Sequence, residues 1–159
     1  MSSIEEWVLL AYRLPRVPST PRSAVWRRLR RLGVAQLADG LVALPADART
    51  REALEWVAEE VLEHRGEATV WLGRPADRAG SADLIRRMTA AIAAEYDAVT
   101  AEAETSQELD EVYRRRTCAR LRRRLHQVEE RDFFAPPQHA AARRAVEALA
   151  AATTAAGRP

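Results

Sequence analysis

The sequence predicts an α+β protein, with a ferredoxin-like βαββαβ sheet domain over residues 1–75 followed by an α-helical region over residues 81–155. Two observations predict this class. In the first part, four short apolar runs and two amphipathic helical patterns alternate in the order strand, helix, strand, strand, helix, strand. The second part carries apolar residues at heptad-like spacing over long stretches, which is typical of helices packed against one another.

Composition and capping residues mark the first strand and the first helix. Residues 7–12 form an apolar run rich in strand-forming residues, and Pro15 ends it. Thr20 is a good N-cap, and Pro21 suits the first helical position. Gly33 can end the helix in the left-handed conformation. These signals predict a strand followed by a helix of about three turns.

A hairpin signal and a second cap predict the rest of the sheet domain. Asp39-Gly40 separates two apolar runs, which is a strong signal for a two-residue β-hairpin. Asp47 can cap a second helix, which Gly66 ends, and residues 68–72 form the fourth strand. In a sheet of this type, the first and third strands lie in the middle and the fourth pairs with the first. We expect all four tryptophans in the core, namely Trp7, Trp26, Trp56 and Trp71.

The helical region is predicted to hold an antiparallel helix pair and a short helix rich in alanine. Residues 74–80 have the composition of a linker, and Ser81 can cap the first long helix. Thr105 and Glu108 form a capping-box pattern, which predicts the start of the second long helix. Pro137 suits the start of the last helix.

One ion pair can be predicted between the two long helices. Glu95 lies inside the apolar arc of the first long helix, so its carboxylate needs a partner. If the chain turns near Thr105, residue 95 lies opposite residue 115. We therefore predict a structural ion pair between Glu95 and Arg115, with Arg114 and Arg116 as the alternatives.

The charge of the chain nearly cancels, but its distribution is uneven. The 159 residues hold 25 Arg, no Lys and 23 acidic residues, for a net charge of +2. Residues 76–112 carry a net charge of −6, and residues 113–159 carry a net charge of +7. Adjacent blocks of opposite sign usually neutralise each other within a fold. We therefore expect part of the basic block to be paired internally.

The composition excludes several classes of protein. No apolar run approaches the roughly 20 residues that span a bilayer, and Glu5 and Glu6 stand where a signal peptide would carry positive charge. We therefore expect a cytoplasmic protein without membrane insertion. The one cysteine, Cys118, allows neither an internal disulfide nor a thiolate metal cluster. The three histidines show no triad spacing, so we expect no catalytic residue, metal or cofactor.

Two arginine-rich surfaces are candidates for binding an oxyanion or a nucleic acid. A guanidinium group binds phosphate and similar oxyanions through two parallel hydrogen bonds. The first surface is a row along the second long helix, formed by Arg116, Arg120, Arg123 and Arg131. The second lies at the start of the first helix, where free backbone N–H groups also favour anions, and it includes Arg13, Arg22 and Arg27. The alternative for both is a solvated basic helix face.

Four segments together suggest a family. They read W-V-L-L-A-Y-R-L-P at 7–15, P-S-T-P-R-S-A-V-W-R-R-L-R-R-L-G at 18–33, L-A-D-G-L-V-A-L-P at 37–45 and R-L-R-R-R-L-H-Q-V-E-E-R-D-F-F at 120–134. In this order they resemble the N-terminal region of the chromate-resistance protein ChrB, over roughly residues 5–150. Members of this family are regarded as regulators or accessory factors of bacterial chromate-resistance operons. The resemblance therefore implies sensing or transcriptional regulation, with DNA, chromate and sulfate as candidate partners.

The resemblance also bears on catalysis and on further partners. Longer family members carry a second, C-terminal domain, so a separately encoded C-terminal domain is another candidate partner. The sheet domain is also similar to PaaX-type repressors and to the small ferredoxin-like subunit of the CRISPR adaptation complex. In nuclease-like relatives, a metal-binding Asp follows the Tyr that ends the first strand. Here Arg13 follows Tyr12, and an arginine cannot ligate a cation.

We therefore expect a protein that is not an enzyme. A structural partner of a separate domain, an accessory subunit and a relic nuclease stay open as alternatives. The first strand is apolar on both faces, so we expect the C-terminal helices or a second copy to cover its second face. We favour a homodimer to which the C-terminal helices contribute.

Overall fold

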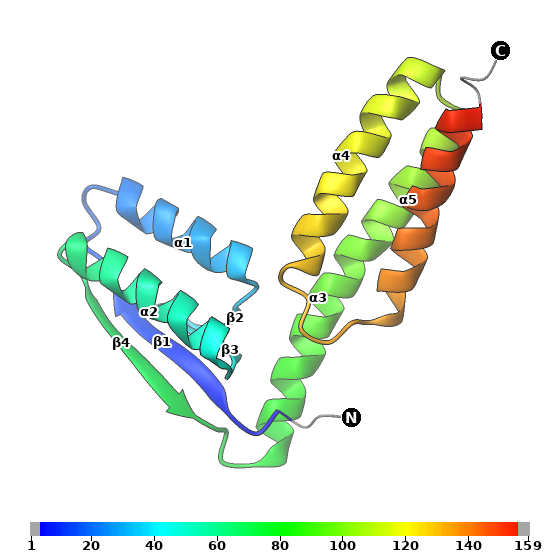
Figure 1. The fold of residues 1–159 in the computed structure, drawn as a ribbon. Helices are drawn as coiled ribbons and strands as arrows, with labels where there is room; N and C mark the ends of the chain where they lie inside the picture. Colours follow the sequence, from blue (N-terminus) through cyan, green and yellow to red (C-terminus); the bar gives the residue numbers. More distant parts are fainter. Residues whose placement is uncertain (1–3, 156–159) are drawn as a thin grey trace. The chain divides into compact units, whose positions relative to one another are not determined.

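The computed structural model describes residues 4–155 and has the predicted α+β class. These residues divide into two compact units between Met88 and Thr89, here called the sheet unit and the helical unit. The long helix α3 (Arg78–Thr105) runs through the division (Figure 1). The segment predicted as a linker corresponds to the loop that precedes α3 and to its first residues. The helix begins at Arg78, so the predicted cap Ser81 lies inside it.

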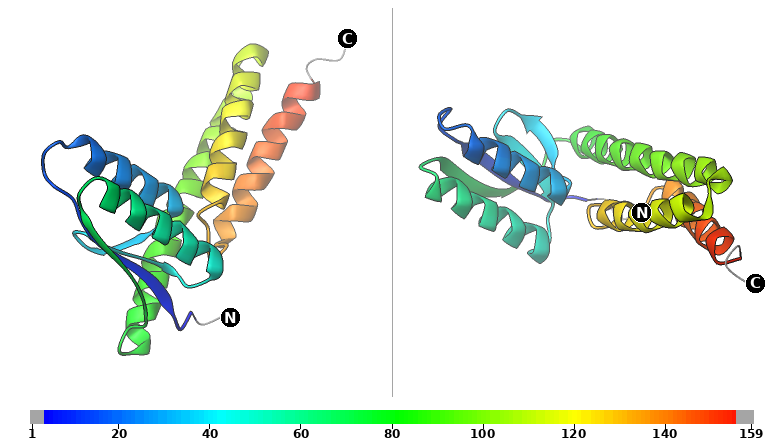
Figure 2. Two further views of the ribbon diagram at one scale, coloured as in Figure 1. Left: turned by 60° about the vertical axis from the view of Figure 1, so that its left-hand side comes forward. Right: turned by 90° about the horizontal axis from the view of Figure 1, so that it is seen from above.

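The sheet unit contains four strands and two complete helices. They are β1 (Trp7–Arg13), α1 (Thr20–Leu32), β2 (Ala35–Ala38), β3 (Leu41–Pro45), α2 (Ala48–Glu63) and β4 (Glu67–Gly73). The strand order is β2-β3-β1-β4, and all neighbouring strands are antiparallel. This is the predicted ferredoxin-like order. Helices α1 and α2 pack side by side on one face of the sheet (Figure 2).

Two glycines allow the tight turns of this unit. Gly33 ends α1 with a φ of 78°, and its N–H donates to the carbonyl of Arg30 at 3.1 Å. Gly40 lies in the turn between β2 and β3 with a φ of 75°. A side chain there would collide with the carbonyl oxygen of Tyr12. The hairpin predicted from Asp39-Gly40 is confirmed.

The core of the sheet unit lies between the sheet and its two helices. Its large buried side chains are Val8, Leu10, Val25, Leu29, Val42, Leu44, Leu54, Val57 and Val61. On the other face of β1, Trp7 is 1% exposed, and its indole N–H donates to the hydroxyl of Ser81 at 3.1 Å. The beginning of α3 therefore covers one end of this second face.

Of the four tryptophans, Trp7 is buried in the core, Trp26 is half-buried, and the other two are exposed. Trp56 and Trp71 are 59% and 58% exposed. Trp56 lies on the side of α2 opposite to its buried stripe, which includes Leu54, Val57 and Val61. Trp71 lies on β4, which is an edge strand. The expectation that all four tryptophans lie in the core is therefore wrong for Trp56 and Trp71, and Trp26 is only half-buried.

We expect the Asp47→Ala variant to lose about 1 kcal/mol of stability at neutral pH. The Asp47 carboxylate accepts a hydrogen bond from the backbone N–H of Thr50 at 2.7 Å, and the Thr50 hydroxyl bonds back to the N–H of Asp47. The bond from the Thr50 N–H lowers the pKa of Asp47. Because the folded pKa is lowered, this stabilisation is present at neutral pH and is lost as the pH falls below about 4.

Urea denaturation followed by tryptophan fluorescence measures this effect, because all four tryptophans lie in the sheet unit. The difference between wild type and variant should shrink in acid. A difference that stays constant down to about pH 2 would contradict the capping role.

The helical unit consists of the rest of α3, a short 3₁₀ turn (Ser106–Glu108), α4 (Glu111–Glu129) and α5 (Pro137–Ala155). Its large buried side chains are Ile92, Tyr96, Val99, Cys118, Leu121, Leu125, Val128, Val146 and Leu149. The predicted capping box at Thr105 is wrong, because α3 continues through this residue and α4 begins at Glu111. The Thr105 hydroxyl instead donates to the carbonyl of Ala101 at 3.0 Å.

No helix within residues 4–155 is long and apolar enough to cross a membrane.

A single carboxylate organises the turn between α4 and α5. Asp132 accepts hydrogen bonds from the backbone N–H groups of Phe134 and Ala135, at 3.1 and 2.9 Å. It also accepts the hydroxyl of the fully buried Tyr96 at 2.9 Å. Burial, and then this bond, raise the pKa of Tyr96 well above its ordinary value. Asp132 therefore joins the turn to α3 and satisfies a buried hydroxyl.

Candidate functional site

An open pocket of about 880 Å³ lies at the end of β1, entirely within the sheet unit. Four parts of the chain form its wall: the end of β1 and the loop after it, the first turns of α1, the turn between β2 and β3, and the start of β4. Its lining includes Tyr12, Arg13, Arg16, Ser19, Arg22, Ser23, Trp26, Asp39, Arg65 and Glu67. The pocket is therefore built by tertiary structure and not by one motif.

The lining is basic. Arg13, Arg16, Arg22 and Arg65 line the pocket, against two carboxylates, Asp39 and Glu67. Within residues 4–155, none of these four arginine side chains forms a hydrogen bond or an ion pair with another residue. Their charges are therefore available to a ligand.

Tyr12 reports on the electrostatics inside the pocket. Its partial burial raises the pKa of its hydroxyl, and the nearby positive charge of Arg22 opposes that rise, while Asp39 adds to it. The Arg22 guanidinium therefore acts on the phenol of Tyr12 across the pocket. Because its pKa is raised, the Tyr12 phenol is neutral at physiological pH and can donate a hydrogen bond.

Close backbone packing forms the base of the pocket. The N–H of Tyr12 donates to the carbonyl of Gly40 at 2.8 Å. On the other side of β1, a Cβ at Gly66 would collide with the carbonyl oxygen of Arg13. The residue before it, Arg65, has a φ of 62° and turns the chain from α2 into β4. Glycine at positions 40 and 66 thus lets the neighbouring segments close around the end of β1.

The structure brings together two of the three arginines predicted for this surface. Arg13 and Arg22 both line the pocket, whereas Arg27 is exposed on α1 and does not line it. Arg27 is five residues after Arg22, which places it about 140° around the helix. Arg16 and Arg65 were not predicted. Arg16 follows the strand closely and could have been found from the sequence, but Arg65 joins the pocket only through the pairing of β4 with β1.

A comparison with protein-family models shows which family the chain resembles. A model described as Protein ChrB, N-terminal, matches residues 22–156. The chain belongs to this ChrB family. The match confirms the resemblance and associates the chain with chromate resistance. The comparisons with curated proteins and with solved structures gave no match.

The match covers most of the chain and part of the pocket. Arg22 and Arg65 lie inside the matched range of this ChrB-family chain, and so do the arginines of α4. Arg13 and Arg16 lie just before it. The pocket therefore combines matched residues with residues of the first strand and the loop after it.

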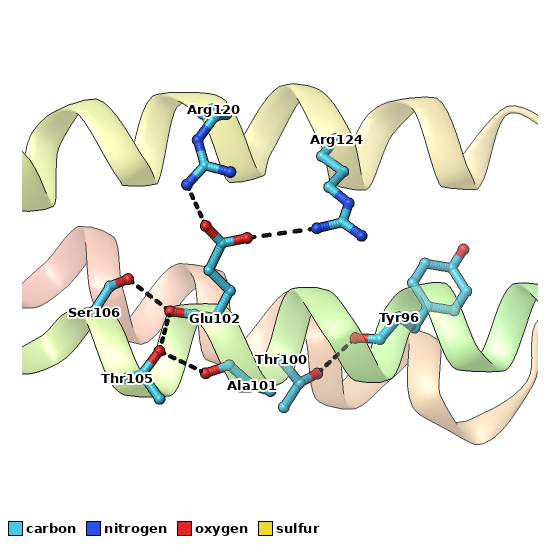
Figure 3. A network of polar contacts seen from close by, with 8 residues as sticks. All are labelled: Tyr96, Thr100, Ala101, Glu102, Thr105, Ser106, Arg120 and Arg124. Atoms are coloured by element: carbon cyan, nitrogen blue, oxygen red, sulfur yellow. Dashed lines mark hydrogen bonds and ion pairs between the residues drawn. The ribbon is translucent and has the colours of Figure 1, made fainter.

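The arginine row on α4 is partly neutralised by carboxylates of α3. Arg120 pairs with one oxygen of Glu102, and Arg124 lies 3.4 Å from the other oxygen (Figure 3). The bond from Arg120 lowers the pKa of Glu102. Arg116 and Arg123, from the same predicted row, are exposed and have no side-chain partner within residues 4–155.

The predicted partner of Glu95 is wrong. Both terminal nitrogens of Arg131 donate to the Glu95 carboxylate, with Nη2 at 2.6 Å from Oε2, and this bond raises the pKa of Arg131. Arg115 pairs with Glu111 on its own helix at 2.6 Å. The register of the two helices also differs from the predicted one, since Glu102 pairs with Arg120 and Arg124, and Glu95 pairs with Arg131. The start of α4 at Glu111 accounts for part of this difference.

The remaining titratable side chains form local contacts in the helical unit. His139 Nε2 lies 2.8 Å from a carboxylate oxygen of Glu129, and its ring packs on Tyr96 with centroids 5.2 Å apart. Cys118 is buried. Over residues 4–155, no three His, Cys, Asp or Glu side chains are grouped closely enough to hold a metal ion.

Proposed function

We propose that this chain is a regulatory or accessory protein of bacterial chromate resistance, and that its pocket binds the oxyanion to which that system responds. Family membership supports the association with chromate resistance. The observation that carries the oxyanion proposal is the group of four arginines that line one pocket and have no partner among the residues the structure describes. In this proposal the chain binds its ligand and does not transform it.

The chemistry of the pocket suits a tetrahedral dianion such as chromate or sulfate. A guanidinium offers two parallel N–H groups to an oxyanion, and such charge-assisted bonds are about twice as strong as neutral ones. Because the four arginines have no side-chain partner among residues 4–155, binding breaks none of the ion pairs that these residues form. The hydroxyls of Ser19 and Ser23 also line the pocket and can donate to the remaining oxygens.

Contact with DNA through α4 is a second candidate, and a narrower observation favours it. Arg114 donates to two backbone carbonyls, and three other arginines of this stretch pair with carboxylates. Three arginines on α4 have no side-chain partner among the described residues, namely Arg116, Arg122 and Arg123. They could contact a phosphate backbone, but they form a smaller basic surface than the sequence predicts.

We expect Arg22→Ala to weaken the binding of chromate by between roughly tenfold and 100-fold. The variant removes one charge-assisted contact, which contributes about 1.5–3 kcal/mol. Arg27→Ala is the matched control, because it removes the same charge from the same helix outside the pocket. Isothermal titration of each protein with sodium chromate, and then with sodium sulfate, measures the effect.

The titration has two results that would end the proposal. One is the absence of chromate binding by the wild type at millimolar concentration. The other is an equal loss of affinity in the two variants, which would indicate general attraction to a basic surface. Binding of sulfate as tight as that of chromate would keep the oxyanion site and remove its selectivity.

A further inference from the structure

The two edges of the sheet differ in how well they are protected. An edge strand presents unpaired backbone N–H and C=O groups, and stable proteins shorten, bulge, charge or cover such strands. The β2 edge has only four residues, and its pairing is irregular between Gln36 and Ala38. The β4 edge has seven residues, and all seven pair with β1 without a break in register. Only the β2 edge is therefore short and bulged.

Apolar side chains flank the β4 edge on both faces of the sheet. Trp71 pairs across from Leu9 and is 58% exposed, and the next residue, Leu72, points to the other face and is 50% exposed. Within β4 there is no proline and no basic residue, and Glu67 at its start is the one charged residue. A regular, apolar edge of this kind can pair with a strand from another chain.

Helix α2 extends this apolar surface on the helical face. The 2.5 Å ion pair between Arg28 and Glu60 marks the side of α2 that faces α1. Leu62 lies about 200° around the helix from Glu60, so it points to the opposite side, toward the β4 edge. It is 55% exposed. Leu62, Trp71 and Leu72 thus surround the unpaired side of β4.

We propose that the β4 edge is a homodimer interface, in which β4 of one copy pairs antiparallel with β4 of a second copy. A two-fold axis perpendicular to the sheet produces this pairing and joins the two sheets into one of eight strands. The pairing of the two β4 strands is self-complementary in charge, because Glu67 begins the strand and Arg74 directly follows it. Antiparallel pairing brings the acidic end of each strand to the basic end of the other.

The same axis places the two α2 helices in register for packing. α2 contacts both β1 and β4, and adjacent strands lie about 4.8 Å apart, so two symmetry-related α2 helices come about 10 Å apart. That distance is typical of packed helices. Arg51 and Glu55 lie on the same side of α2 as Leu62 and pair with each other at 2.9 Å. This side of the helix is therefore nearly neutral, so two copies of it can approach each other.

Light scattering coupled to size-exclusion chromatography tests the interface on the full chain. We expect the wild type to have twice the monomer mass of 17.8 kDa, and we expect Trp71→Lys to be a monomer. Trp56→Lys is the matched control, because Trp56 is 59% exposed but points away from the edge; it should remain a dimer. Thr69→Lys lies on the same strand and replaces a smaller side chain than Trp71→Lys does. We expect this variant to be a monomer as well. Circular dichroism checks that each variant is folded.

Three results would overturn the interface. The first is a wild type that stays monomeric at its highest soluble concentration, which would leave the edge to a different partner. The second is a folded Trp71→Lys and a folded Thr69→Lys that both remain dimers. The third is an equal loss of the dimer in Trp56→Lys, which would place the contact on the outer side of α2.

Discussion

Replacing Arg13 and Arg22 together by glutamate should abolish the binding of chromate, with a loss of affinity greater than about 100-fold. Both arginines line the pocket, and neither has an internal partner within residues 4–155. Each replacement removes an attractive charge and adds a repulsive one beside Asp39 or Glu67, which already line the pocket. The variant pocket therefore holds an excess of negative charge and rejects a dianion.

A charge-matched control separates local binding from general attraction. Arg27 and Arg31 lie on the exposed surface of α1 and do not line the pocket. Replacing both by glutamate changes the net charge by the same amount, so we expect a small loss of affinity that disappears as salt is raised. Titration at two salt concentrations makes the comparison. Equal losses in the two double variants at high salt would contradict a specific site.

Asp132→Ala should lower the free energy of unfolding of the helical unit by about 3 kcal/mol. The variant removes three hydrogen bonds at once, two from the backbone of the turn and one from the hydroxyl of Tyr96. Because Tyr96 is fully buried, its hydroxyl then has no replacement partner in water. Ala135 also has a φ of 43°, so the turn depends on these bonds to keep an unfavourable backbone conformation.

Urea denaturation followed by far-ultraviolet circular dichroism measures this loss. Asp110→Ala is the matched control, because Asp110 stands at the N-cap of α4 but its side chain forms no capping hydrogen bond. We expect that variant to change stability by no more than about 0.5 kcal/mol. If the two variants were equally stable, Asp132 would not organise the turn.

Local signals predicted most of the sheet unit; the predicted N-cap Thr20 is wrong, because α1 begins at Thr20 and Ser19 is its N-cap, without a side-chain capping bond. The left-handed glycine after α1, the Asp39-Gly40 turn and the Asp47 cap each depend on a few neighbouring residues, and the structure confirms all three. Once the order of strands and helices is known, few sheet topologies are compatible with it. The ferredoxin-like order follows for that reason.

The helical unit shows why ion pairs are harder to predict. Thr105 and Glu108 match a capping box, but the Thr105 hydroxyl can equally bond to a carbonyl one turn earlier, and it does so. Because the prediction placed the turn near Thr105, it paired Glu95 with Arg115. In the structure, Glu95 pairs with Arg131, and Arg115 pairs with Glu111. A small error in one turn changes the partner of each charged residue along both helices.

The pocket was only half predictable for a different reason. Arg13 ends β1, and Arg22 lies in the first turn of α1, the next element along the chain. Their proximity therefore follows from the local order of the elements. Arg65 is far from both in sequence and reaches the pocket only because β4 pairs with β1. The exposed positions of Trp56 and Trp71 likewise depend on tertiary packing, which residue type alone does not report.

The most direct test of the oxyanion site is diffraction at the chromium absorption edge from crystals soaked in chromate. The proposed function predicts an anomalous peak inside the pocket, within hydrogen-bonding distance of the guanidinium groups of Arg13 and Arg22. An empty pocket with anomalous peaks beside Arg116 and Arg123 on α4 would contradict it.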